Sequence, residues 1–262
     1  MKNIYFISDA HLGCKALEHR RMQERRLVRF LDDIKDKADA IYLLGDMFDF
    51  WFEYQEVVPK GYTRFLGKLS ELTDSGIEVH YFTGNHDMWT NGYLHKECGV
   101  IIHEEPITIE IHNKIFYLAH GHKVKVKGVK ISKYEQFMFW CFENKTLQRI
   151  ARWFPSGLFM RFGFKWAKHS HVNHHINGTP EYLGDDKECF MLFAKDYLVS
   201  HPDVNYFIFG HRHIDVNKDI TPESRLIILG QWYSLFTYAR FDGNELTISH
   251  YLEGDKDNHA RL

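Results

Sequence analysis

The stretch 3-NIYFISDAH-11 joins an apolar run to two side chains of the type that bind metals, and the same combination recurs along the chain. Residues 3–8 are apolar enough to form a buried strand, and Asp9 and His11 follow directly. These two side chains are two positions apart, so on an extended backbone they point to the same side. The stretch therefore predicts a strand with a functional site at its carboxyl end.

Apolar strands and amphipathic helices alternate through the first third of the chain. This rhythm favours an α/β fold with a largely parallel sheet covered by helices. A hairpin with its turn at Asn113–Lys114 follows, and four further strands close the chain. The expected strands cover 3–8, 39–46, 77–87, 107–121 (the hairpin), 204–213, 225–230, 234–241 and 246–252, and the expected helices cover 18–37, 61–76, 133–154, 157–175 and 181–202.

Metal-type ligands end five of these apolar segments. In an α/β sheet such residues gather at the carboxyl ends of the strands, so the five motifs can meet at one point. Each motif alone is common by chance, but five in succession, each closing an apolar strand, predict a metal site. The motifs are Asp9 with His11, Asp46 after Gly45, Asn85-His86-Asp87 after Gly84, His120 or His122 around Gly121, and His211 with His213.

Residues 123–183 have a different composition from the rest of the chain. Between Lys123 and Lys168 there are eleven Lys or Arg, only two Asp or Glu, and eleven aromatic residues, in a chain whose net charge is −2. A stretch that is both basic and apolar suggests an anionic partner with an apolar part. We therefore expect a core formed by 1–122 and 184–262, and a helical insertion over 123–183.

Several classes of protein are disfavoured by composition. The four cysteines are far apart and form no CxxC pair, which is typical of reduced thiols in a cytosolic protein. No run approaches the 18 or so apolar residues of a transmembrane helix. The apolar run at the amino terminus breaks at Asp9, too early for a signal peptide, so we expect the protein to stay inside the cell.

The order D-x-H, GD, GNHD, H and GH-x-H resembles the calcineurin-like metallophosphoesterases. Within that superfamily the likeness is greatest to the UDP-2,3-diacylglucosamine pyrophosphatases of lipid A synthesis, through SDAHLG at 8–13, GDMFDFW at 45–51 and the helical insertion. TGNHDMW at 83–89, KHS at 168–170 and LGQWYSLFTYARFDG at 229–243 look like the Bacteroidetes-type branch. The resemblance implies a sandwich of mixed β-sheets flanked by helices, with a helical cap.

The resemblance also implies roles for the motif residues. His86 would lie outside the metal shell and donate to the phosphoryl oxygen or the leaving group, with Asp87 as its orienting partner. Spacing does not choose between His120 and His122, but the patterns HGD and HGH share only the first histidine, which favours His120. Two divalent ions are implied, and the likeness favours Mn²⁺. One ion would take Asp9, His11 and His213, the other Asn85, His120 and His211, and Asp46 would bridge them.

Three positions depart from the family pattern. Proteobacterial members carry arginine where His86 stands, most members have aspartate in place of His122, and an acid is expected in place of Gln231. These changes leave the metal ligands intact and bear on the substrate. The expected substrate contacts are Asn85, His122, Lys123, Tyr134, Lys165, Lys168 and His169. Lys123, Lys125 and Lys127 form either an arm that closes on an anionic head group or a solvated basic strand.

Three functions remain open. The first is hydrolysis of UDP-2,3-diacylglucosamine to 2,3-diacylglucosamine 1-phosphate and UMP, by an enzyme held at the cytoplasmic face of the inner membrane through its cap. The second is a different phosphodiesterase or phosphatase, acting on nucleotides or another phospholipid-like substrate. The third is a scaffold without catalysis, which has no need for an intact ligand set. The apolar cap disfavours a nucleic-acid partner, and no stable protein partner is implied.

Overall fold

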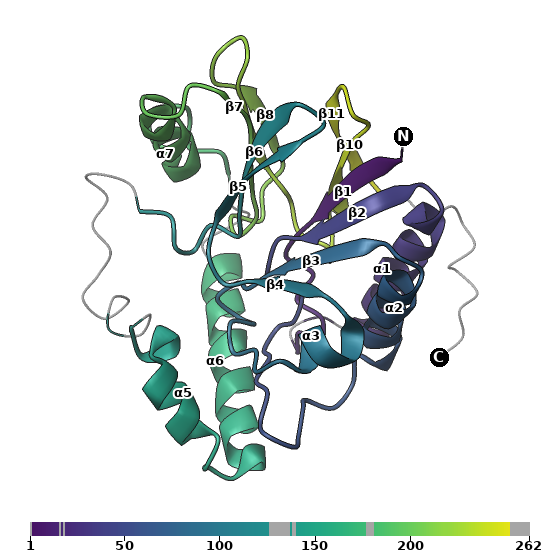
Figure 1. Ribbon diagram of the computed structural model, residues 1–262. Helices are drawn as coiled ribbons and strands as arrows, with labels where there is room; N and C mark the ends of the chain where they lie inside the picture. Colours follow the sequence, from purple (N-terminus) through teal and green to yellow (C-terminus); the bar gives the residue numbers. More distant parts are fainter. Residues whose placement is uncertain are drawn as a thin grey trace.

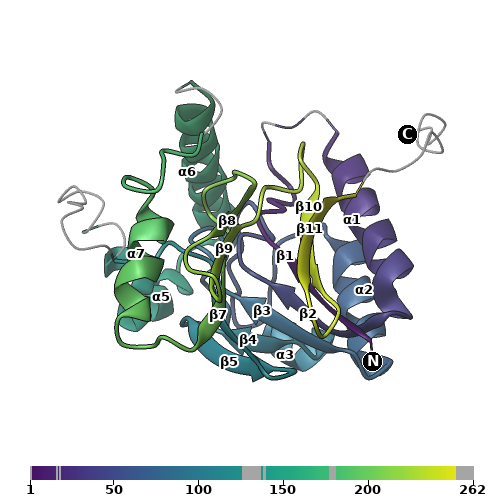
Figure 2. The same cartoon turned by 90° about the horizontal axis from the view of Figure 1, so that it is seen from above.

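The computed structural model describes residues 2–15, 17, 19–125, 137, 140–176 and 181–251, without the side chains of 168–176. Two β-sheets face each other, with helices on both outer sides (Figures 1 and 2). None of the described helices has both the length and the apolar composition needed to cross a membrane. The fold is thus the mixed α/β sandwich that the family resemblance implied.

The first sheet has six strands in the order β11-β10-β1-β2-β3-β4. Strands β1 to β4 are parallel to one another, β10 pairs with β1 in antiparallel fashion, and β11 pairs with β10 in the same way. Because the first four strands are parallel, the loops after their carboxyl ends share one edge. The strands are β1 (Asn3–Ile7), β2 (Ala38–Leu43), β3 (Glu78–Phe82), β4 (Ile101–His103), β10 (Thr237–Phe241) and β11 (Leu246–His250).

The second sheet has five strands in the order β5-β6-β7-β9-β8. Its three central strands, β6, β7 and β9, run parallel, and the edge strands run antiparallel to them. The strands are β5 (Ile107–Ile111), β6 (Lys114–Ala119), β7 (Val204–Phe209), β8 (Val216–Asp219) and β9 (Arg225–Ile228).

Alternate side chains of β1 supply two different cores, as the two-residue period of a strand requires. Ile4 and Phe6 point into the core between the sheets, where the Phe6 ring stacks on Phe116 with centroids 5.8 Å apart. Tyr5 and Ile7 point into the core beneath the outer helices. These helices are α1 (Arg20–Lys35), α2 (Thr63–Asp74) and the short α3 (Tyr93–Cys98), while α7 (Cys189–Leu198) covers the second sheet.

Helices α5 (Lys145–Ala151) and α6 (Ser156–Ile176) do not cover either sheet but project away from the two sheets and their covering helices (Figure 1). The turn between them lies at the end of the pair that is farthest from the sheets in this view. The pair contacts the core through a separate aromatic cluster that includes Phe50, Phe52 and Ala167.

Several predicted boundaries were wrong for identifiable reasons. The hairpin turn is His112–Asn113, because Ile111 pairs with Lys114 and both turn residues have positive φ, as a type I′ turn requires. The helix predicted over 133–154 breaks at Asn144, whose side chain caps α5. The helix predicted over 181–202 begins only at α7, after a turn at Gly184 with φ of 94°.

Candidate metal centre

The five sequence motifs meet beside the carboxyl ends of the parallel strands. Among the described residues, the possible ligand atoms of each group lie within 4.8 Å of one another. The groups are Asp9, His11 and His213; His11, Asp46 and His86; and Asp46, His120 and His211. Asp46 belongs to the second and third groups, which suits a residue expected between two ions.

Five of the expected ligands have left-handed backbone conformations, which non-glycine residues rarely adopt. Their φ angles are 53° for Asp9, 44° for His11, 51° for Asp46, 67° for His211 and 55° for His213. Conformations of this kind persist only where the surrounding structure holds them, and they cluster at functional sites.

Asp9 and Asp46 each accept a backbone amide hydrogen bond with one carboxylate oxygen and face the histidines of the cluster with the other. Asp9 Oδ2 accepts from the His211 amide at 2.8 Å, and Asp46 Oδ1 accepts from the His86 amide at 2.8 Å. The other oxygen of Asp9, Oδ1, is buried 3.2 Å from His213 Nε2 and 3.8 Å from His11 Nε2. A buried carboxylate oxygen next to two histidine ring nitrogens is suited to a divalent metal ion with oxygen and nitrogen ligands.

The protonation state of each histidine in the cluster bears on this role, because a histidine binds a metal through an unprotonated ring nitrogen. Burial lowers the pKa of His11 to about 4 and that of His211 to about 3, so both rings are neutral at pH 7 and each has a lone pair for a metal. Burial also opposes charge on His120, yet the neighbouring Asp46 carboxylate raises its pKa to about 9. In the absence of metal ions the carboxylates thus draw positive charge to the cluster.

His120, rather than His122, lies within contact distance of the other residues expected at the second ion. Its Nδ1 lies 2.8 Å from the Leu44 carbonyl oxygen, and its Nε2 lies 3.2 Å from Asp46 Oδ2 and 3.2 Å from Asn85 Oδ1. The His122 ring lies 5.4 Å from the His120 ring, and both of its nitrogens are buried without a hydrogen-bond partner among the described residues.

Gly121 separates these two histidines because no other residue fits there. Its φ is 124°, and an added Cβ would meet the Phe190 ring at 2.4 Å. Phe190 belongs to α7, so this helix fixes the backbone between the two rings.

His86 lies at the same cluster, and its orientation comes from a backbone group. Its Nδ1 is 2.7 Å from the carbonyl oxygen of Asp49, so Nδ1 carries a proton and donates it to that oxygen. We expected Asp87 to orient this ring. Instead, Asp87 accepts from the Tyr81 hydroxyl at 2.6 Å and from the amides of Met47 and Gly84, each at 2.7 Å. Asp87 therefore ties the second and third motif loops together.

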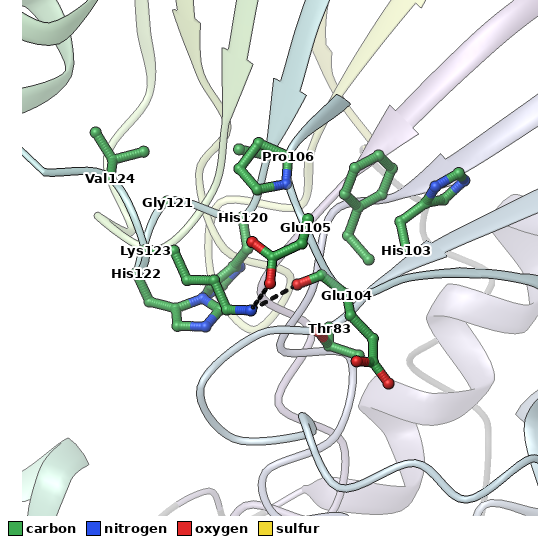
Figure 3. A pocket seen from close by; sticks show the side chains of 12 residues that line it. Thr83, His103, Glu104, Glu105, Pro106, His120, Gly121, His122, Lys123 and Val124 are labelled. Atoms are coloured by element: carbon green, nitrogen blue, oxygen red, sulfur yellow. Dashed lines mark hydrogen bonds and ion pairs between the residues drawn. The ribbon is translucent and has the colours of Figure 1, made fainter. Parts of the chain in front are cut away.

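Lys123 is turned towards the loop between β4 and β5. Its Nζ donates to the Glu104 carbonyl at 2.7 Å and to Glu105 Oε1 at 2.6 Å, at a small cavity that His120 and His122 also line (Figure 3). Its role as a substrate contact stays a prediction. Lys165 is exposed on α6. Tyr134 and Lys127 lie outside the described residues, as do the side chains of Lys168 and His169.

An aromatic wall borders the cluster on the side of α6. The Trp166 ring lies 5.1 Å from the His86 ring, and Phe50 packs against Phe159 and Phe164. Gly163 permits this contact, since an added Cβ would meet the Phe50 ring at 2.2 Å. The α6 helix thus brings apolar surface directly to the catalytic candidate His86.

Two supporting groups were not predicted from the sequence. The Tyr233 hydroxyl lies 3.2 Å from His213 Nδ1, and Arg212 binds the buried carboxylate of Glu188. Gln231, which departs from the family pattern, accepts with its Oε1 from the amides of Tyr233, Ser234 and Leu235. It shapes the turn that carries Tyr233, a role that a carboxylate oxygen would fill equally well.

The chain is similar to known phosphoesterases over most of its length. The sequence profile of the calcineurin-like phosphoesterases matches residues 2–215, a range that includes every expected metal ligand. A UDP-2,3-diacylglucosamine hydrolase of Porphyromonas gingivalis is 41% identical over 255 residues, which cover 94% of this chain and 96% of the relative. One of Vibrio vulnificus is 27% identical over 241 residues, with 87% and 89% covered. The E. coli phosphoesterase Yfce aligns at 13% identity with a TM-score of 0.46, covering 95% of this chain and 92% of that one.

Proposed function

This chain belongs to the calcineurin-like phosphoesterase family, and we propose that it hydrolyses UDP-2,3-diacylglucosamine to 2,3-diacylglucosamine 1-phosphate and UMP. The observation that carries the proposal is the 41% identity to the P. gingivalis hydrolase, which extends over 94% of this chain. Coverage of that extent includes most of residues 123–183, which we take to be the cap, as well as the metal motifs. The chain is accordingly a metal-dependent hydrolase.

The proposed ligands follow the groups that meet at the strand ends. Asp9, His11 and His213 would hold one divalent ion, Asn85, His120 and His211 would hold the other, and Asp46 would contact both. When bound, two such ions activate a water molecule and neutralise the charge of the phosphate. Manganese is our proposal for both positions: nitrogen and oxygen ligands suit manganese, iron or zinc, and the family likeness favours manganese.

His86 is proposed to act on the phosphate without binding a metal. The Asp49 carbonyl holds its Nδ1, so the ring orientation is fixed and Nε2 can donate a hydrogen bond or a proton to the phosphoryl oxygen or the leaving group. His122 is proposed to contact the same phosphate, because its buried ring nitrogens have no partner among the described residues and a phosphate oxygen would supply one.

The apolar part of the substrate is proposed to lie along α6. Trp166, 5.1 Å from His86, begins a surface that continues through Phe159 and Phe164. Acyl chains bound there would leave the pyrophosphate at the metal ligands, which accounts for a basic and aromatic cap beside a phosphate site.

We further propose that the α5–α6 pair rests on the cytoplasmic surface of the inner membrane. Large apolar side chains are exposed around the turn between α5 and α6, including Trp153 with 86% of its surface exposed and Leu158 with 65%. Arg149 and Arg161 are exposed beside them. Apolar residues flanked by cations suit an anionic membrane surface, which attracts basic side chains by about 1 kcal/mol each.

Vesicle sedimentation tests this membrane contact. The protein should sediment with phosphatidylglycerol vesicles and much less with phosphatidylcholine vesicles, and W153S/F154S should sediment much less than the wild type with phosphatidylglycerol vesicles. Val199→Ser is the matched control, since Val199 is 84% exposed but lies next to α7, away from the pair. Equal sedimentation of the double variant and the wild type would contradict the contact.

A comparison of two substrates tests the function itself. Manganese-loaded protein should hydrolyse UDP-2,3-diacylglucosamine with a far higher kcat/KM than bis-p-nitrophenyl phosphate. In isotopically labelled water the label should appear in UMP, as the family likeness implies, and not in the sugar 1-phosphate. A higher kcat/KM for the model diester would instead favour a general phosphodiesterase.

A further inference from the structure

Arg212 stands between His211 and His213, and its guanidinium binds a buried acid. Its Nε lies 3.1 Å from Glu188 Oε1, and its Nη2 lies 3.4 Å from Glu188 Oε2. A planar fork that contacts both carboxylate oxygens fixes orientation as well as distance, which a lysine cannot do.

Burial and backbone hydrogen bonds hold Glu188, the partner of this guanidinium group, in place. It is fully buried and directly precedes α7, where its carbonyl oxygen accepts from the Leu192 amide at 3.0 Å. Its own amide donates to the Gly184 carbonyl at 2.8 Å. Since α7 packs on the second sheet through Phe190 and Met191, the carboxylate is tied to the rigid core.

The turn that Arg212 occupies needs such an anchor. His211 and His213 both have positive φ, and the Arg212 amide donates to the Gly210 carbonyl at 2.7 Å, which closes the turn tightly. A left-handed conformation at two non-glycine residues is kept only by contacts from outside the turn.

We propose that Glu188 and Arg212 are positioning residues of the metal centre. Their ion pair holds the 211–213 turn so that the two histidines present their rings to two different ions. Arg212 Nη2 also donates to the Glu181 carbonyl at 3.4 Å, so the same side chain connects the end of the insertion to the ligand turn. This inference rests on the ligand roles proposed above for His211 and His213.

Metal affinity tests the proposal without reference to turnover. Metal-free wild type, Glu188→Gln and Arg212→Lys would be titrated with Mn²⁺ by calorimetry. Both variants should bind manganese about 10–100-fold more weakly, the range seen when a residue that supports the ligands from outside the metal shell is lost. Asp219→Asn is the matched control: it removes the exposed Asp219–Arg225 pair of β8 and β9, 3.0 Å long, and should leave the affinity unchanged.

A double variant separates positioning from simple stabilisation of the fold. Loss of one partner of a buried pair also lowers Tm, whereas E188L/R212M replaces both partners by apolar groups and should restore Tm. The proposal expects the manganese affinity of this double variant to stay weak. Single variants that keep wild-type affinity, or a double variant that regains it, would overturn the proposal. A wild type that binds no manganese would instead overturn the metal centre itself.

Discussion

Nδ1 of His120 lies 2.8 Å from the carbonyl oxygen of Leu44, and this contact determines which nitrogen can bind a metal. A carbonyl oxygen only accepts, so Nδ1 carries the proton. Nε2, which faces Asp46 and Asn85, is then the nitrogen that could bind a metal ion in place of a proton. A backbone partner of this kind is the usual support of a ligating histidine.

His120→Asn should therefore lose bound metal, whereas His122→Asn should keep it. The reason is that only His120 has its free nitrogen within 3.2 Å of two other expected ligands. Manganese content after gel filtration, measured by elemental analysis, distinguishes the two variants. Metal loss with His122→Asn alone would show that the other histidine of the motif is the ligand.

Asp46→Asn should lose both metal and activity while the fold is retained. The amide oxygen can still accept from the His86 amide, the 2.8 Å contact that Asp46 Oδ1 makes, so the loop should keep its shape. The missing negative charge should reduce occupancy at both positions, because Asp46 Oδ2 lies 3.8 Å from Nε2 of His11 and 3.2 Å from Nε2 of His120, one proposed ligand of each ion. Circular dichroism confirms folding, and two bound ions in this variant would refute the shared contact.

The local motifs could be predicted from the sequence because each joins a strand to its ligands within a few residues. Their supports could not, since they come from distant positions: Leu44 is 76 residues from His120, Asp49 is 37 from His86, and Glu188 is 24 from Arg212. In the fold, β4 and α3 are too short to show a period, with three and six residues. Strand β8, with the polar sequence VNKD, has no apolar alternation.

Gln231→Glu should leave stability and activity close to wild type, while Gln231→Ala should lose about 1–3 kcal/mol of unfolding free energy. The glutamate retains the oxygen that accepts from the amides of Ser234 and Leu235, at 2.9 and 3.1 Å. Alanine leaves these amides without that acceptor and loosens the turn that carries Tyr233. Urea unfolding measures the difference. An altered substrate preference in Gln231→Glu would show instead that this position contacts substrate.

Stability should fall as the pH drops from about 6.5 towards 4, in part through the pair of His80 and His103. Their ring nitrogens lie 3.0 Å apart, and burial lowers the pKa of His103 to about 4 and also lowers the pKa of His80. The unfolded chain therefore takes up protons at a higher pH than the folded chain, so acid favours unfolding in this window.

The variant His103→Asn isolates that contribution. Because the histidines of the metal cluster also titrate, the measurement is the difference between the two Tm–pH curves of metal-free wild type and variant. The wild-type curve should be steeper between about pH 6.5 and 4. Parallel curves would mean that this pair does not contribute to acid sensitivity.

His86→Ala should keep both metals and lose about 10²–10⁴-fold in kcat. The alternative is that His86 itself binds a metal, since its ring lies close enough to His11 and Asp46 for metal ligation. Two observations favour a role on the substrate side: the Asp49 carbonyl orients the ring, and Trp166 of α6 lies 5.1 Å from it, where the apolar part of the substrate is proposed to bind. Elemental analysis and turnover measured on the same sample separate the two roles. A variant that is slow because it lacks one ion would make His86 a ligand, and a variant with full metal and full activity would remove it from the reaction.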